Sequence, residues 1–137
     1  MKRIVEDLQG IVGERYVVVE QARIGDYLVD ETAEVVRPQP ADDVVLVKPA
    51  NAHEVSHILG YANENMIPVY PRGGGTGLVG GAVPTQRGIV LSLERMDKVE
   101  VDRENLMAVA EAGVTLERLL AAVDEAGLSF PLHPGEE

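Results

Sequence analysis

The sequence predicts an α/β fold, or α+β in the broader sense: a small parallel sheet followed by a more antiparallel set of strands with a helix. Residues 43–70 have the pattern of a strand, a helix and a second strand, which is typical of a β-α-β unit. Residues 97–110 have the pattern of two alternating strands joined by a turn. The chain of 137 residues fits one domain that can bury a core.

The first 42 residues are expected to form a helix and an irregular lead-in to the main domain. Four apolar residues fall on one stripe of a helix over residues 2–12, and Gly13 suits its C-terminal end: Ile4, Leu8, Ile11 and Val12. A Val-rich patch at 17–19 precedes an irregular, acidic stretch. We interpret its carboxylates as a solvated face: Asp26, Asp30, Glu31 and Glu34.

The β-α-β unit begins a domain predicted to cover residues 43–137. The continuous apolar run Val44 to Val47 indicates a strand buried on both faces. Asn51 can cap the following helix, with Glu54 in the capping-box position. The apolar stripe of that helix is Val55, Ile58, Leu59 and Ala62. Ile67 to Tyr70 is the next strand, so parallel pairing with a right-handed crossover is expected.

The second half of the domain continues with a third apolar strand, Ile89 to Leu93. Strands over 97–101 and 106–110 are joined by a hairpin turn, Asp102 to Asn105. Thr115 can cap a last helix, which Gly127 ends. The apolar face of this helix is Leu116, Leu119, Leu120 and Val123.

Composition excludes several classes of protein. Lys and Arg total 12 against 23 Asp and Glu, and the formal net charge of −11 argues against nucleic-acid binding, which needs a basic surface. The absence of Cys excludes disulfides, thiolate catalysis and Cys-based metal sites within the chain. The longest apolar runs are too short for a membrane span. Residues 1–9 carry too many polar residues for a signal peptide, so we expect a cytoplasmic protein.

A glycine-rich loop, residues 72–81, is the strongest functional signal. Residues 73–81 contain six Gly, which are costly to order because Gly loses the most backbone freedom on folding. Such a loop between apolar strands makes sense if successive backbone N–H groups curl around anionic oxygens. Arg72 at its start could contact a pyrophosphate or bind the loop's own carbonyl groups, and the sequence leaves both open.

The type of phosphate site follows from the flanking elements. Residues 75–80 match G-x-G-x-x-G, but a Rossmann loop must open a helix, and here a strand follows. A Walker loop is excluded because no Gly-Lys-Ser/Thr follows the glycines. The pattern therefore predicts a strand–loop–strand cradle.

In this order the segments resemble the FAD-binding domain of the vanillyl-alcohol oxidase / p-cresol methylhydroxylase (PCMH-type) superfamily. Within it, they are most similar to the group of glycolate oxidase, D-lactate dehydrogenase and D-2-hydroxyglutarate dehydrogenase. The resemblance covers residues 43–137, including part of the second, more antiparallel subdomain. The segments that carry it are 67–73, 80–84, 88–93 with 96–99, and 108–113 with the Thr115 helix, 130–131 and 134–135.

The resemblance implies that the glycine-rich loop wraps the pyrophosphate of FAD. Some relatives tether the flavin through a His of this loop, whereas Thr76 stands here, so FAD is expected to be bound non-covalently. The expected cofactor-binding residues are Pro71, Arg72, Gly73, Gly74, Gly75, Thr76, Gly77, Leu78, Gly80, Gly81, Ala82, Pro134 and Gly135. No residue is assigned to catalysis or to a metal.

The implied function is that of an FAD-binding subunit of a 2-hydroxy-acid (glycolate or D-lactate type) oxidase or dehydrogenase. Relatives continue past this point with the rest of the FAD domain and a substrate domain that carries the catalytic residues. We therefore expect a truncated or split subunit, weak or absent FAD binding by the chain alone, and a second chain that completes the domain. The alternative is a non-catalytic remnant that oligomerises, because an incomplete sheet leaves unpaired edges.

A third hypothesis rests on residues 53–57, His-Glu-Val-Ser-His, which match the H-E-x-x-H motif of zinc proteases. His133 is a conceivable third ligand. Helical periodicity places His53 and His57 almost opposite the apolar stripe, so we expect two solvent-exposed histidines rather than an enclosed site.

Overall fold

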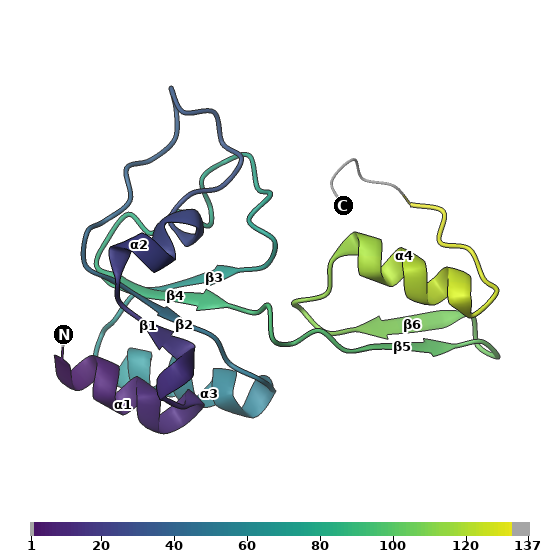
Figure 1. Ribbon diagram of the computed structural model, residues 1–137, viewed down its shortest axis with the longest axis horizontal. Coiled ribbons are helices and arrows are strands. Elements are labelled where there is room, and N and C mark those ends of the chain that lie inside the picture. The colour runs from purple at the N-terminus through teal and green to yellow at the C-terminus, as the bar shows by residue number, and fades with distance from the viewer. Residues whose placement is uncertain (1, 133–137) are drawn as a thin grey trace.

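The computed structural model describes residues 2–132 and consists of two parts joined by the chain after β4 (Figure 1). The first part holds a four-stranded sheet with helices on both faces, and the second holds a hairpin with one helix. The elements of the first part are α1 (Lys2–Val12), η1 (Glu14–Tyr16), β1 (Val17–Val18), α2 (Gln21–Ile24), η2 (Gly25–Tyr27), β2 (Val44–Val47), α3 (Ala52–Glu64), β3 (Val69–Arg72) and β4 (Gly88–Ser92). Those of the second are β5 (Val99–Asp102), β6 (Met107–Ala110) and α4 (Leu116–Glu125).

The four-stranded sheet has the order β1-β2-β4-β3. Both β2 and β3 run parallel to β4, which lies between them. The predicted β-α-β unit is therefore parallel, but its two strands are separated by a third strand from later in the chain. The sequence did not predict that β1 pairs antiparallel with β2, since two residues carry no periodicity.

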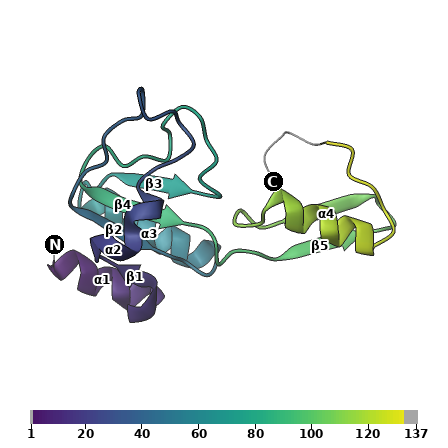
Figure 2. The same cartoon turned by 45° about the horizontal axis from the view of Figure 1, so that its top comes forward.

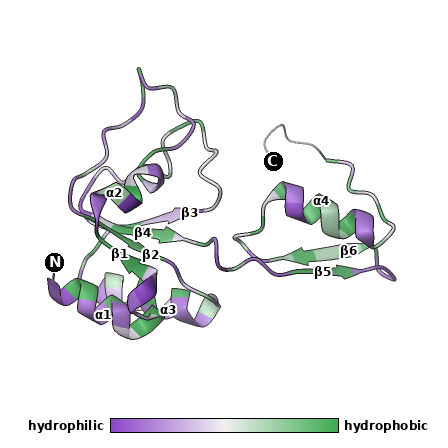
Figure 3. Ribbon diagram, viewed as in Figure 1, coloured by the Kyte–Doolittle hydropathy of each residue, from purple (hydrophilic) through white to green (hydrophobic). Residues whose placement is uncertain are grey.

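Both faces of the sheet are buried, as the apolar run in β2 predicts. Val45 and Val47 pack with α1 and α3 on one face, around Leu8 and Ile58. Val44 and Leu46 pack on the other face with Ile24 of α2. Figure 3 shows the apolar colour concentrated in β1, β2 and β4 of the sheet. The predicted domain boundary between residues 42 and 43 stays a prediction. In the structure, α1 and β1 pack in the same hydrophobic core as β2.

The start of α3 is capped as predicted. The Asn51 side chain accepts a hydrogen bond from the Glu54 N–H at 2.9 Å. The Glu54 carboxylate reaches back to the Ala50 N–H at 2.7 Å, one residue before the usual capping-box partner. The predicted apolar stripe is confirmed at Ile58 and Ala62 but wrong at Leu59, which is 45% exposed.

The prediction of the second strand was wrong at its start, because β3 begins at Val69 rather than at Ile67. The Ile67 N–H bonds to the Ala62 carbonyl and Met66 has a φ of 53°, so these residues form the exit turn of α3. At the other end β3 includes Arg72, which sits opposite Ser92 of β4. The glycine-rich loop therefore leaves directly from a paired strand.

The second part holds the predicted hairpin and helix, but β5 begins at Val99 rather than at residue 97 and β6 begins at Met107 rather than at residue 106. The Asp102 side chain accepts hydrogen bonds from the N–H groups of Glu104 and Asn105 and so shapes the hairpin turn between β5 and β6. Thr115 caps α4 by accepting from the Arg118 N–H, and Gly127 with φ of 73° follows its end. All of β6 is exposed, although its four residues are apolar. Within residues 2–132, no helix is long and apolar enough to cross a membrane.

We predict that Ile58→Ala, which empties a fully buried position, lowers the free energy of unfolding by about 2–5 kcal/mol. The neighbouring change Leu59→Ala should cost below about 1 kcal/mol, because that side chain is half exposed already. Urea unfolding followed by circular dichroism measures both. Equal losses would contradict the assignment of the buried face of α3.

Candidate functional site

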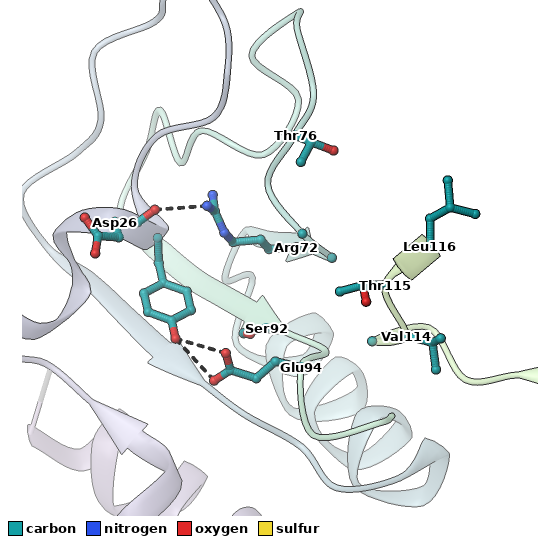
Figure 4. A pocket seen from close by; sticks show the side chains of 12 residues that line it. Asp26, Arg72, Thr76, Ser92, Glu94, Val114, Thr115 and Leu116 are labelled. Carbon is teal, nitrogen blue, oxygen red and sulfur yellow. Dashed lines mark hydrogen bonds between the residues drawn. The ribbon is translucent and has the colours of Figure 1, made fainter. Parts of the chain in front are cut away.

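A cleft of about 450 Å³ lies where the ends of β3 and β4 face the start of α4 (Figure 4). The parallel register brings the carboxyl ends of these two strands together, which is where open parallel sheets bind ligands. Its lining residues are Asp26, Tyr27, Arg72, Gly73, Gly74, Thr76, Ser92, Glu94, Gly113, Val114, Thr115 and Leu116.

The glycine-rich loop borders this cleft with free backbone donors. Within residues 2–132, no group accepts a hydrogen bond from the N–H groups of residues 73–79. Gly75 and Gly80 both have φ of 75°, a conformation that side chains disfavour. Most of residues 73–79 are solvent-exposed. Such a run of unengaged donors is suited to anionic oxygens.

The Arg72 side chain forms hydrogen bonds within the protein. Its guanidinium donates to the Val29 carbonyl at 2.6 Å and to the Asp26 carbonyl at 2.9 Å. These acceptors belong to the lead-in and not to the glycine-rich loop, so of the two alternatives left open by the sequence, the one in which Arg72 binds the loop's own carbonyls is not what the structure shows. The side chain also fills the space beside Gly75, where a Cβ would overlap it.

The opposite wall of the cleft comes from residues 113–116. A Cβ at Gly113 would overlap the Leu93 carbonyl group, so only glycine allows this approach. Thr115 and Leu116 begin α4, and the first N–H groups of a helix attract negative charge. The sequence identified Thr115 as a cap without showing that it faces the glycine-rich loop.

A polar network lies on the Glu94 side of the cleft. The Tyr27 hydroxyl donates to Glu94 at 3.0 Å, and Lys48 forms an ion pair with Glu94 and a hydrogen bond to the Tyr27 oxygen at 2.9 Å. Burial alone would lower the pKa of the Lys48 ammonium, but the bonds to Glu94 and Tyr27 prevail and raise it. Lys48 is therefore charged and balances the carboxylate beside the cleft.

The predicted acidic face needs one correction. Asp26, Glu31 and Glu34 are exposed, but Asp30 is only 5% exposed and lies beneath the glycine-rich loop. An aspartate in an acidic run gives no sequence signal of burial, because its bonding partners come from elsewhere in the chain.

The structure brings four of the expected cofactor residues to the cleft: Arg72, Gly73, Gly74 and Thr76. The others that it describes lie in β3 or along the rest of the loop, outside the lining: Pro71, Gly75, Gly77, Leu78, Gly80, Gly81 and Ala82. Pro134 and Gly135 lie outside the described residues. Sequence reasoning assigned no site role to Ser92, Glu94 or residues 113–116. The one sequence feature that could have indicated residues 113–116 was Gly113, since a glycine can mark a close backbone approach.

The histidines of the H-E-x-x-H motif are exposed on α3, as the periodicity predicts. Their rings lie 4.3 Å apart between centroids. Between residues 2 and 132, no group of three or more potential metal-ligating His, Cys, Asp or Glu side chains occurs. His133 lies outside the described residues.

Known proteins share sequence with this chain. The model of the FAD binding domain family matches residues 44–137. A D-lactate dehydrogenase of Archaeoglobus fulgidus is 58% identical over 111 residues, which is 81% of this chain and 25% of that protein. The glycolate oxidase subunit GlcD of Bacillus subtilis is 40% identical over 90 residues, 65% of this chain and 19% of that protein. The chain thus spans about a quarter or less of the length of these relatives.

Solved structures agree with the fold. p-Cresol methylhydroxylase superimposes with a TM-score of 0.77 at 26% identity, over 93% of this chain and 25% of that one. Alkyldihydroxyacetonephosphate synthase, at 21% identity, matches in fold with a TM-score of 0.82, over 98% of this chain and 29% of that one. The chain therefore belongs to the FAD binding domain family, with the fold of PCMH-type flavoenzymes and FAD as its cofactor.

Proposed function

We propose that this chain is the FAD-binding part of a 2-hydroxy-acid oxidase or dehydrogenase of the glycolate or D-lactate type, and that its glycine-rich loop cradles the FAD pyrophosphate. The observation that carries the loop's role is that the N–H groups of residues 73–79 find no acceptor among the described residues, beside a cleft that also faces the start of α4. The identity to a D-lactate dehydrogenase supports the substrate class.

The residues fit such a cofactor. A dianionic pyrophosphate needs several donors, and residues 73–79 offer them without requiring cations in an acidic chain. The proposed contacts are those expected from the sequence, Pro71 to Leu78, Gly80 to Ala82, Pro134 and Gly135. Because the chain has no Cys and carries Thr76 in the loop, we propose non-covalent binding.

Bound FAD would supply the acceptor for the two electrons removed from a hydroxy acid. The chain's own residues would hold the cofactor: loop amides on the pyrophosphate, and Gly113 allowing close approach of the far wall. Since the chain spans about a quarter of its relatives, substrate binding and proton removal are assigned to the whole protein.

A second candidate, self-association, is favoured by the exposed hairpin. Met107 and Val109 of β6 are 56% and 64% exposed, and Leu106 beside them is 73% exposed. Unpaired strand edges with apolar side chains favour pairing. Sedimentation at high micromolar concentration tests this candidate, and a clean monomer would remove it.

For the FAD site we predict that Gly75→Val weakens FAD binding by at least about tenfold, or 1.4 kcal/mol. Valine is strained at φ of 75° and would overlap the Arg72 guanidinium. Calorimetric titration of the 137-residue chain gives the affinity. Gly60→Ala, at an open position of α3, is the matched control and should bind as the original chain does. Undiminished binding by folded Gly75→Val protein would contradict the loop's role.

For Arg72 we predict that Arg72→Lys lowers the free energy of unfolding by about 1–3 kcal/mol, because lysine cannot bond both carbonyls with one planar fork. Arg87→Lys, an exposed arginine before β4, should change it little. Unchanged stability together with a large loss of FAD affinity would instead mean that Arg72 contacts the pyrophosphate.

The hydroxy-acid assignment is tested on the whole protein to which this proposed FAD-binding part belongs, loaded with FAD. We expect D-lactate or glycolate to bleach its visible flavin absorbance under anaerobic conditions, because two electrons then rest on the flavin. Stopped-flow absorbance records the change, with L-lactate as the comparison. Bound flavin that no 2-hydroxy acid reduces would overturn the substrate class while leaving the FAD site intact.

A further inference from the structure

The lead-in segment, residues 26–32, holds the glycine-rich loop at two points. At the loop's start, Arg72 bonds to the carbonyls of Asp26 and Val29. Farther along, the Gly80 N–H donates to the Thr32 hydroxyl oxygen at 2.7 Å. Figures 1 and 2 show the chain that follows α2 running beside the loop between β3 and β4. Fixing both points removes much of the loop's conformational freedom.

Asp30 anchors the second attachment. Its Oδ1 accepts a hydrogen bond from the Thr32 N–H at 3.0 Å, in the local bond pattern that aspartate favours in turns. Asp30 and Thr32 are 5% and 3% exposed. Hydrogen bonding with the Thr32 side chain outweighs burial and lowers the pKa of Asp30. The carboxylate is therefore ionised at neutral pH, and its bond to the Thr32 N–H holds the Thr32 backbone in this turn.

The other carboxylate oxygen of Asp30, Oδ2, is buried against the glycine-rich loop. Of the buried side-chain polar atoms in the described part of the chain, Asp30 Oδ2 alone has no partner. It lies 3.7 Å from the place that a Cβ on Gly77 would take. Burying a carboxylate oxygen without a hydrogen-bond partner costs free energy. The bond from the Thr32 N–H to the other carboxylate oxygen helps to keep Asp30 in this position.

Gly80 is shaped by the same segment of chain. Its φ of 75° favours glycine, and a Cβ there would lie 2.9 Å from the Pro38 ring. Arg37 donates to the Thr32 carbonyl at 2.9 Å. We call the hydrogen bond between Thr32 and Gly80, with the Asp30 and Arg37 bonds that hold Thr32, the clamp. The backbone at Gly80 is thus set by Thr32 and Pro38 from outside the loop.

We propose that Asp30 and Thr32 are positioning residues that pre-order the second half of the glycine-rich loop for its cofactor. A loop ordered before binding loses less conformational entropy when the ligand arrives, so affinity rises. Asp30 and Thr32 precede the family-matched region, residues 44–137, and line no part of the cleft. The ordering of the loop is inferred from the hydrogen bonds of Asp30 and Thr32. Its effect on the affinity for FAD rests on the proposed function.

The test of loop order is amide hydrogen exchange at Gly80, measured by NMR on the 137-residue chain. Thr32→Val keeps the shape but removes the acceptor, and should speed exchange of the Gly80 amide about tenfold. Thr32→Ser restores the oxygen and should restore protection. Thr85→Val makes the same change at an exposed position outside the clamp and should have no effect. Unchanged Gly80 exchange in folded Thr32→Val protein overturns the clamp.

FAD titration of the same variants tests the consequence. Thr32→Val should raise the Kd for FAD several-fold, with Thr32→Ser and Thr85→Val close to the original chain. If the original chain binds FAD and Thr32→Val binds equally well despite faster Gly80 exchange, pre-ordering is overturned while the FAD site stands. If the chain binds no FAD, the proposed binding by this chain fails, and Gly80 exchange alone decides whether Thr32 orders the loop.

Discussion

The parallel pairing of β4 with both β2 and β3 is the constraint on which the rest of the structure depends. β4 is buried along its whole length, and Gly88 at its start lies so close to Pro68 that a Cβ would overlap the Pro68 carbonyl oxygen. Because β3 and β4 end together, Arg72 comes to lie opposite Ser92. The glycine-rich loop and Glu94 therefore leave the sheet at the same edge, and the cleft forms there.

An acidic chain that binds a polyanionic cofactor must avoid electrostatic repulsion. Arg72, the cation at the loop, is engaged by two backbone carbonyls, and Lys48 is engaged by Glu94. Within the described residues, backbone N–H groups without an acceptor then remain beside the cleft, over residues 73–79 of the loop and at the start of α4. The proposed recognition by amides would depend on backbone shape rather than on net charge, and a loop rich in glycine suits it.

The sequence could predict the elements whose determinants are local. The apolar run of β2, the Asn51 cap and the Asp102 turn each depend on neighbours within a few residues, and all three are confirmed. Family resemblance, resting on several ordered segments, supplied the cofactor. The contact between the loop and the pyrophosphate stays a prediction, because a local sequence pattern indicates a suitable backbone but does not identify the bound ligand.

What could not be predicted depends on distant partners. The insertion of β4 between β2 and β3 pairs strands that lie far apart in the sequence, and no local pattern in β2 signals it. Arg72 finds its acceptors 43 and 46 residues away, and Thr32 meets Gly80 across 48 residues. The buried Asp30 lies beside Gly77 of the distant loop, so periodicity and composition in the acidic stretch gave no sign of its burial.

The cleft also depends on a glycine outside the loop. The Gly113 N–H donates to the Met96 carbonyl at 2.8 Å, and the Met96 N–H donates to the Leu93 carbonyl at 2.9 Å. These bonds tie the end of β4 to the start of α4, and a Cβ at Gly113 would overlap the Leu93 carbonyl group. The separation of the two walls is therefore set by backbone contact at Gly113, as the loop's path is set by Gly75 and Gly80. One wall of the cleft comes from each part of the chain, and the contact at Gly113 is where the backbones of the two parts meet.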